Sequence, residues 1–350
     1  MASTSAIRVL IADDSAFMRR LLTDALARQG FNVVGAVEDG DQALAACQDL
    51  RPDVMTLDLA MPGLDGIGVL RALRGSSLSI PVVVVSAFSP AHGARAVDAL
   101  AEGAVELVAK PAAGEPITSF ISELAEKVRG AAGSRPHSVA AGARLPSSLP
   151  RRDVRPSAPR RPSKARAVVI ACSTGGPRAL AELLPGLPAP LGVGTLIVQH
   201  MPQGFTKSLA DRLDRASKLN VREAQAGDKM EPGVALIAPG GSHLRLRSDK
   251  STTLGDSEPI GGLRPRADLT IADAAKIFGR DLLLVVLTGM GKDGLEGARE
   301  VKKAGGRILA EAESSCTVYG MPRAIVEESL ADGVYDISEL ANAVAAEAGA

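Results

Sequence analysis

Short apolar runs alternate with helical patterns along the first 129 residues. The runs that predict β-strands cover residues 7–12, 31–37, 54–57, 81–86 and 106–108. Between these runs apolar residues recur at helical spacing, for example at Leu22, Ala25 and Leu26. Nearly continuous apolar strands joined by helices are typical of a parallel sheet with helices on both faces. We therefore predict a three-layer α/β domain for residues 1–129.

The pattern breaks between residues 130 and 166. This segment holds six prolines, nine basic residues and one acidic residue, with no aromatic residue among them. Such a segment cannot bury enough apolar surface to offset the entropy of ordering its chain. We predict a flexible basic linker, and a linker of this length spans roughly 35 Å on average. That reach is long enough for one domain to lie against the other.

The alternation of strands and helices resumes at Ala167. Strand-like runs cover residues 167–171, 194–199, 234–237, 282–287 and 307–310. Helical patterns, such as those at residues 207–216 and 269–278, separate them. We predict a second and larger α/β domain over residues 167–350, doubly wound around a parallel sheet, and we find no internal repeat.

The formal net charge of zero is the sum of three unlike segments. Residues 1–129 hold 11 Lys/Arg and 16 Asp/Glu, residues 130–166 hold 9 and 1, and residues 167–350 hold 20 and 23. Both predicted domains are thus acidic, and there is no Trp for base stacking, so we expect no binding of nucleic acid. The longest aliphatic run is far shorter than the ~20 residues that cross a bilayer, so we expect no membrane insertion. Three cysteines without zinc-site spacing fit a reducing cytoplasm.

Polar residues follow the strands predicted in the first domain. Asp13 and Asp14 follow the first strand, Asp58 follows the third, Ser86 ends the fourth and Lys110 follows the fifth. Ligands bind at the carboxyl ends of strands in open parallel sheets. Three converging carboxylates repel one another unless a hard cation lies among them. Mg²⁺ suits this position because it accepts carboxylate oxygens, keeps several waters and leaves room for phosphate.

Such a pocket allows Asp58 to attack a phosphoryl group. The Mg²⁺ ion, the Lys110 ammonium and the Ser86 hydroxyl would then neutralise the oxygens of the acyl phosphate. Each residue taken alone is an ordinary loop residue. Their joint placement at strand ends is what favours a phosphorylation site.

Residues 6–127 resemble the flavodoxin-like receiver domain of two-component response regulators. The resemblance rests on Asp13-Asp14-Ser15, on Leu57-Asp58-Leu59-Ala60-Met61-Pro62 with Asp65-Gly66, and on Lys110-Pro111. It implies that Asp58 accepts a phosphoryl group from a chemotaxis histidine kinase. It also implies that Mg²⁺ is bound by Asp13, Asp14, Asp58 and the carbonyl of Ala60. Leu107 stands where the family often has an aromatic switch residue, which argues against coupling through a rotating ring.

The first strand of the second domain leads into a glycine-rich turn, Cys172-Ser173-Thr174-Gly175-Gly176. A hydroxyl at a strand-to-helix turn is exposed and lies near the positive end of the helix. Such turns also bind phosphate, so the turn alone permits a nucleophile, an anion site or a structural turn. Two further strand ends deliver His200 and Asp293, which could meet Ser173 on one rim. Histidine would remove the serine proton and aspartate would orient the imidazole, so the pattern favours a serine hydrolase.

The second domain closely resembles the CheB family of chemotaxis protein-glutamate methylesterases. The matching blocks are Cys172-Ser173-Thr174-Gly175-Gly176, Gln199-His200-Met201-Pro202, Ala238-Pro239-Gly240 with His243, Leu287-Thr288-Gly289-Met290-Gly291 with Asp293-Gly294, and Val318-Tyr319-Gly320-Met321-Pro322. The resemblance implies a catalytic triad of Ser173, His200 and Asp293. It places an oxyanion-binding region at Thr174 and the backbone N–H of Met290, and it implies hydrolysis without a cofactor.

The implied substrates are glutamyl methyl esters on methyl-accepting chemoreceptors. Deamidation of receptor glutamines should be weaker, because the amide leaving group needs a proton. We expect the unphosphorylated receiver domain to obstruct the active site. Two departures from the family are Arg264-Pro265-Arg266-Ala267-Asp268, where a small polar residue more often follows the proline, and Glu311-Ala312-Glu313. A rival hypothesis is a response regulator whose second domain only binds a nucleotide or phosphorylated ligand.

Overall fold

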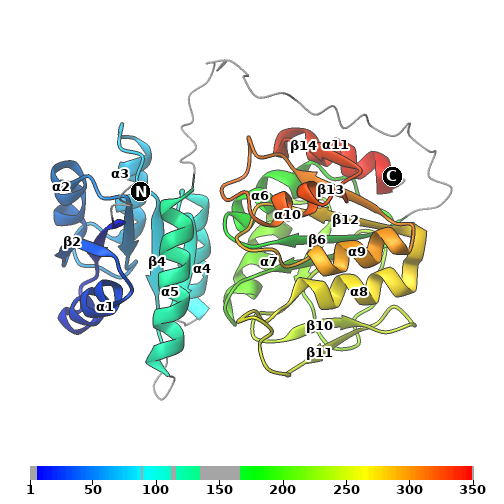
Figure 1. Cartoon of the computed structure of the whole chain (residues 1–350), viewed down its shortest axis with the longest axis horizontal. Helices are drawn as coiled ribbons and strands as arrows, with labels where there is room; N and C mark the ends of the chain where they lie inside the picture. Colours follow the sequence, from blue (N-terminus) through cyan, green and yellow to red (C-terminus); the bar gives the residue numbers. More distant parts are fainter. Residues whose placement is uncertain (1–5, 88–89, 112–115, 135–165, 349–350) are drawn as a thin grey trace.

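The described residues of the chain, in a computed structural model, are 6–87, 90–111, 116–134 and 166–348 (Figure 1). They form two α/β domains, each built on a parallel sheet. No helix in these ranges is long and apolar enough to cross a bilayer.

The first domain has a five-stranded parallel sheet in the order β2-β1-β3-β4-β5. Its strands are β1 (Arg8–Ala12), β2 (Asn32–Val37), β3 (Val54–Leu57), β4 (Val82–Ser86) and β5 (Glu106–Ala109). Its helices are α1 (Ala16–Arg28), α2 (Gly40–Leu50), α3 (Gly66–Arg74), α4 (Pro90–Ala101) and α5 (Ile117–Ala132). The five predicted strands are confirmed to within one residue at each end.

Local side chains set where the helices of the first domain begin. Ser15, Asp39 and Asp65 are the N-cap residues of α1, α2 and α3, and each side chain accepts a hydrogen bond from a backbone N–H of its helix. Such caps satisfy donors that have no partner inside the helix. These caps fix where the loops after β1, β2 and β3 end, and the loops after β1 and β3 carry the polar residues predicted at the strand ends.

Helix α5 continues into the segment predicted as a linker. It continues to Ala132, because Val128 and Ala131 are buried in the core of the first domain and keep the last turn in place. The predicted boundary at residue 130 is therefore wrong by a few residues. The rest of the predicted linker, 135–165, lies outside the described residues.

The second domain has a seven-stranded parallel sheet in the order β14-β13-β12-β6-β7-β9-β8. The predicted strands are confirmed as β6 (Ala167–Cys172), β7 (Thr195–Gln199), β9 (Val234–Ile237), β12 (Leu282–Val286) and β13 (Arg307–Glu311). The pattern missed four short strands, β8 (Asn220–Glu223), β10 (His243–Leu246), β11 (Thr252–Gly255) and β14 (Gly333–Tyr335). Strands β8 and β14 form the edges of the sheet and carry few buried residues.

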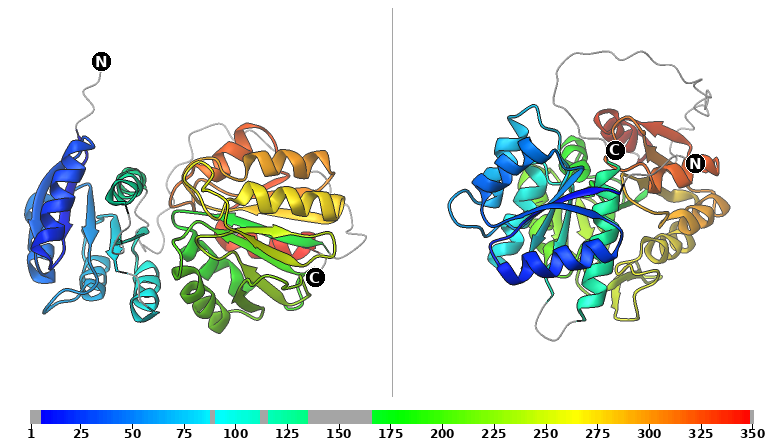
Figure 2. Two further views of the ribbon diagram at one scale, coloured as in Figure 1. Left: turned by 90° about the horizontal axis from the view of Figure 1, so that it is seen from below. Right: turned by 60° about the vertical axis from the view of Figure 1, so that its left-hand side comes forward.

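Helices cover both faces of this second sheet (Figure 2). One face packs against α6 (Gly176–Leu183), α7 (Phe205–Ala216) and α11 (Ile337–Ala348), the other against α8 (Ala267–Phe278), α9 (Leu295–Lys303) and α10 (Met321–Glu327). From β6 the chain runs to β7 on one side, and β12 lies on the other. Ligands in open α/β sheets bind at such a reversal, beyond the carboxyl ends of the strands. The ends of β6, β7 and β12 are thus where the fold places a site.

Helix α4 of the first domain packs against α6 and α7 of the second (Figure 1). At the rim of this interface, Arg212 of α7 forms an ion pair with Asp98 of α4. The interface also reaches the loops after β6 and β12, which carry the predicted catalytic residues.

Candidate active site and phosphorylation site

The carboxyl ends of β1 and β3 bring three carboxylates of the first domain together. One oxygen from each of Asp13, Asp14 and Asp58 lies within 4.8 Å of the other two. Asp13 and Asp58 are buried, whereas Asp14 is exposed. Lys110, which follows β5, places its Nζ 2.8 Å from Asp13 Oδ2 and 2.7 Å from Asp58 Oδ2. Four of the predicted residues thus form one cluster.

The charges of this cluster do not balance. Burial raises the pKa of Asp13 above its ordinary value, although Lys110 acts in the opposite direction. Burial alone would lower the pKa of Lys110, but its hydrogen bonds to Asp13 and Asp58 raise it, so the amine stays charged. One ammonium faces three carboxylates, and the oxygen donors and the excess negative charge fit a divalent hard cation.

Two further predicted residues lie beside the cluster. The amide of Ala60 donates to Asp58 Oδ1 over 3.3 Å. Ser86 is buried at the end of β4, and its hydroxyl donates to the carbonyl of Ala87 over 3.4 Å.

In the second domain, His200 and Asp293 form a buried pair. His200 Nε2 lies 2.7 Å from Asp293 Oδ2. Because a carboxylate only accepts hydrogen bonds, Nε2 is the nitrogen that carries the proton. His200 Nδ1 is buried and has no partner among the described residues, so it is the ring nitrogen able to accept a proton.

Ser173 lies at the neighbouring strand end. The amide of His200 donates to the Cys172 carbonyl, and the amide of Ser173 donates to the Thr288 carbonyl. The ends of β6, β7 and β12 are thereby tied together. Gly289 is required at its position, because a Cβ there would come within 2.9 Å of Ser173 Cβ. No hydrogen bond joins the Ser173 hydroxyl to His200 within the described part of the chain.

The side chain of Gln199, the last residue of β7, links the ends of β6 and β7 by hydrogen bonds. Its side-chain amide donates to the carbonyls of Ser173 and His200, over 3.0 and 2.9 Å. Gln199 is buried, so these bonds are shielded from water. In the sequence Gln199 is only part of a matching block, and nothing local to it indicates this role.

Asp293 is held by donors at the start of α8. Its Oδ2 accepts from the Ala267 amide and its Oδ1 from the Asp268 amide at the start of α8, over 2.7 and 3.0 Å. Arg266 Nε lies 2.9 Å from Oδ1. Burial would raise the pKa of Asp293, but His200, the Ala267 amide and Arg266 hold it well below its usual range. The carboxylate therefore stays ionised and can stabilise an imidazolium.

The two residues of the predicted oxyanion region both contact the first domain. Thr174 is buried, and its hydroxyl donates to Glu106 Oε2 of β5 over 2.7 Å. Met290 lies against α5, where a Cβ at Gly130 would come within 2.7 Å of its Sδ. A glycine in α5 thus leaves room for the methionine of the catalytic loop.

Glu106 is supported within the first domain by Lys127 of α5. Lys127 Nζ lies 3.4 Å from Glu106 Oε1 and 3.1 Å from Glu123 Oε1. Burial would lower the pKa of Lys127, but these two carboxylates raise it above its ordinary value. Neither Glu106 nor Gly130 was singled out from the sequence, because nothing local marks a residue that contacts another domain.

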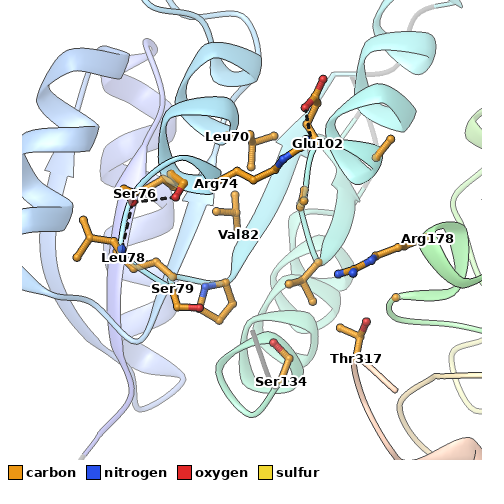
Figure 3. Close-up of a pocket in the computed structure, with 18 of the residues that line it drawn as sticks. Leu70, Arg74, Ser76, Leu78, Ser79, Val82, Glu102, Ser134, Arg178 and Thr317 are labelled. Atoms are coloured by element: carbon orange, nitrogen blue, oxygen red, sulfur yellow. Dashed lines mark hydrogen bonds and ion pairs between the residues drawn. The ribbon is translucent and has the colours of Figure 1, made fainter. Parts of the chain in front are cut away.

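An open cavity of about 580 Å³, lined mainly by the first domain, lies at the interface next to the glycine-rich turn (Figure 3). Arg178 and Thr317 line it from the second domain and Ser134 lines it from the end of α5. Gly175, two residues after Ser173, also lines this cavity. The interface therefore covers the turn without filling all the space beside it.

Comparison with protein families divides the chain in the same way. The family described as CheB methylesterase matches residues 168–344, and the response regulator receiver domain matches residues 9–122.

Similar proteins cover nearly the whole chain. A protein-glutamate methylesterase/protein-glutamine glutaminase of Symbiobacterium thermophilum is 42% identical over 348 residues, which are 97% of this chain and 96% of that protein. The protein of that name in Thermotoga maritima is 40% identical over 334 residues, 94% of each chain. The solved CheB methylesterase catalytic domain of Thermotoga maritima superposes with a TM-score of 0.50 and 44% identity, covering 52% of this chain and 97% of that one. These names leave the ligand-binding alternative without support.

Proposed function

The chain belongs to the CheB methylesterase family, and we propose that it hydrolyses glutamyl methyl esters of chemoreceptors with Ser173, His200 and Asp293 as its catalytic residues. It is a protein-glutamate methylesterase/protein-glutamine glutaminase with a receiver domain. The observation that carries the assignment of the residues is the buried pair of His200 and Asp293, beside the strand end that bears Ser173.

The proposed reaction begins with attack by the Ser173 hydroxyl on the ester carbonyl. His200 Nδ1 accepts the serine proton, and Asp293 stabilises the resulting imidazolium through Nε2. The imidazolium then protonates the leaving methoxide, so methanol departs and an acyl-enzyme remains. Water activated by His200 hydrolyses the acyl-enzyme and restores the serine and the glutamate carboxylate.

We place the oxyanion beside Thr174 and the backbone N–H of Met290. Thr174 directly follows Ser173 after β6, and Met290 follows the neighbouring strand β12, where a donor can meet the charge that develops on the carbonyl oxygen. Glutamine side chains react by the same attack and release ammonia. This reaction should be slower, because the amide leaving group must be protonated before it departs.

CheB-type proteins are in general controlled by phosphorylation of the receiver domain by a histidine kinase. Asp58 is our proposed phosphoacceptor. Asp13, Asp14, Asp58 and the Ala60 carbonyl would hold Mg²⁺, which supplies positive charge to the transferring phosphoryl group when bound. The Lys110 ammonium would neutralise part of the negative charge of the same phosphoryl group. We place this signalling in the reducing cytoplasm, where the three buried cysteines remain thiols.

We propose that the unphosphorylated receiver domain covers the active site. Two contacts support this proposal, the Thr174–Glu106 hydrogen bond and the packing of Met290 on Gly130. A receptor helix cannot reach Ser173 while β5 and α5 occupy the rim. Glu106 begins β5 and Lys110 directly follows its last residue, so a shift of Lys110 toward a phosphoryl group can loosen this contact.

The triad is tested with a fluorophosphonate probe and with methylated receptor membranes. The full chain should be labelled at Ser173 and should release methanol, faster with a phosphodonor. Ser173→Ala should abolish labelling and lower kcat by about 10⁶-fold if the triad behaves like that of a serine protease. Methanol release by Ser173→Ala at the unmodified rate would refute the assignment.

A further inference from the structure

Arg266 occupies the position where the family more often has a small polar residue. Its guanidinium contacts the carboxylate of Asp293. Its side chain is only 19% exposed. Nε lies 2.9 Å from Asp293 Oδ1, and Nη2 lies 2.8 Å from Asp268 Oδ2. Nη1 donates to the carbonyl of Ile260 over 3.3 Å. One guanidinium thus bridges two carboxylates and the loop that precedes α8.

Asp268 explains why a cation is needed here. Its Oδ1 accepts from the amides of Gly294 and Gly297, both over 2.9 Å, so it fastens the start of α9 directly after Asp293. Burial and the nearby charge of Asp293 raise the pKa of Asp268. Without the positive charge of Arg266, the carboxylates of Asp268 and Asp293 would place two negative charges beside His200.

We propose that Arg266 is a positioning residue for the hydrolysis, which holds Asp293 toward His200 and offsets the charge of Asp268, so that His200 faces one net negative charge. The inference rests on the proposed function of Ser173 and His200. A single carboxylate stabilises the imidazolium enough to assist the attack. A second uncompensated carboxylate would hold the proton on His200 and reduce the fraction of enzyme with a free base.

Other charged groups approach this site from neighbouring elements. Glu106 of β5, with Lys127 of α5 behind it, reaches Thr174 from the first domain. Glu311 of β13 accepts from the Thr288 amide below the catalytic loop. The variants proposed below leave these groups unchanged, so differences between the variants report on Arg266 and Asp268.

The test compares Arg266→Ser with Arg266→Lys in the full chain. One carboxylate separates the guanidinium from the imidazole, so the two groups lie within about 8 Å, and loss of the positive charge should raise the titration midpoint of His200 by about one pH unit. At pH values below the midpoint of the unmodified chain, kcat/KM of Arg266→Ser should be about tenfold lower than that of the unmodified chain, because less of the enzyme has a neutral His200. At high pH the loss should be small. Arg266→Lys keeps the charge and should keep the midpoint.

The double variant Arg266→Ser/Asp268→Asn separates charge from structure. The substituted side chain keeps an oxygen for the amides of Gly294 and Gly297 but removes the second negative charge, so the midpoint should return to that of the unmodified chain. A merely structural role of Arg266 would leave the midpoint of Arg266→Ser unchanged, or would leave a shift that Asp268→Asn does not reverse. Either result overturns the proposal.

The ring-proton resonances of the histidines provide a readout that does not depend on hydrolysis. The chain has four histidines, and a His200→Gln spectrum identifies the resonance of His200. If Ser173→Ala hydrolysed receptor esters normally, the proposed function would fail, yet the titration of His200 would still show whether Arg266 and Asp268 set its charge. The two hypotheses are therefore tested separately.

Discussion

The hydrogen bond between Glu106 and Thr174 makes the control of the active site measurable. The donor and acceptor lie 2.7 Å apart and both residues are buried, so the bond is charge-assisted and shielded from water. Hydrogen bonds to charged groups contribute about 1.5–3 kcal/mol. Glu106→Gln keeps a carbonyl acceptor and loses the charge. Because a hydrogen bond between neutral groups contributes only about 0.5–1.5 kcal/mol, we expect a loss of about 1–1.5 kcal/mol.

That loss shifts the equilibrium between the state in which the receiver domain covers the active site and the state in which the active site is uncovered. A change of about 1–1.5 kcal/mol is roughly a five- to tenfold change in their ratio. The unphosphorylated Glu106→Gln chain should therefore release methanol from methylated receptor membranes roughly five to ten times faster than the unmodified chain. The rate in the presence of a phosphodonor should stay the same, because the contact is already broken in that state.

Glu123→Gln is the matched control for this experiment. Glu123 also pairs with Lys127 but is half-exposed on α5, so its loss removes a charge near Lys127 without touching the Thr174 contact. We expect less than a twofold change in the unphosphorylated rate, and thermal unfolding verifies that both variants are folded. Equal unphosphorylated rates for Glu106→Gln and the unmodified chain, with normal activation by a phosphodonor, would show that this hydrogen bond does not hold the receiver domain over the active site.

Three further perturbations have defined outcomes. Chelation of divalent cations, or Asp58→Asn, should abolish activation by a phosphodonor and leave the unphosphorylated rate unchanged; loss of that basal rate would contradict the assigned pocket. Burial raises the pKa of Glu311, so the native state binds a proton more tightly than the unfolded chain and stability falls as pH rises above about 4.5. Glu311→Gln keeps an acceptor for the Thr288 amide, so its gain in melting temperature should grow from pH 4 to pH 7; a gain independent of pH would exclude this cause. Arg212→Ala breaks a partly exposed ion pair with Asp98, so we expect less than about a fivefold rise in the unphosphorylated rate, lost in 1 M salt. A rise that persists in 1 M salt would argue against an electrostatic contact.

The fold and most of the candidate site follow from patterns that are local in the sequence. A strand buried on both faces needs an uninterrupted apolar run, so β1, β4 and β12 could be located from their runs of apolar residues alone. Parallel strands end on one edge of their sheet, so the polar residues after them were expected to converge, and Lys110 does bond to Asp13 and Asp58. The short strands β8 and β14 escaped because edge strands bury too few residues to produce such a run.

The contacts that regulate or tune the site could not be predicted in this way. Glu106 and Thr174 are 68 positions apart and belong to different domains, and Gly130 is one of 36 glycines in the chain. Arg266 was noticed only as an unusual residue, because its approach to Asp293 depends on how the start of α8 packs beside the loop after β12. Backbone geometry repeats every few residues and is therefore visible as periodicity in one dimension. Charge pairing and steric fit between surfaces distant in the chain arise only when those surfaces meet, so they leave no periodic signal.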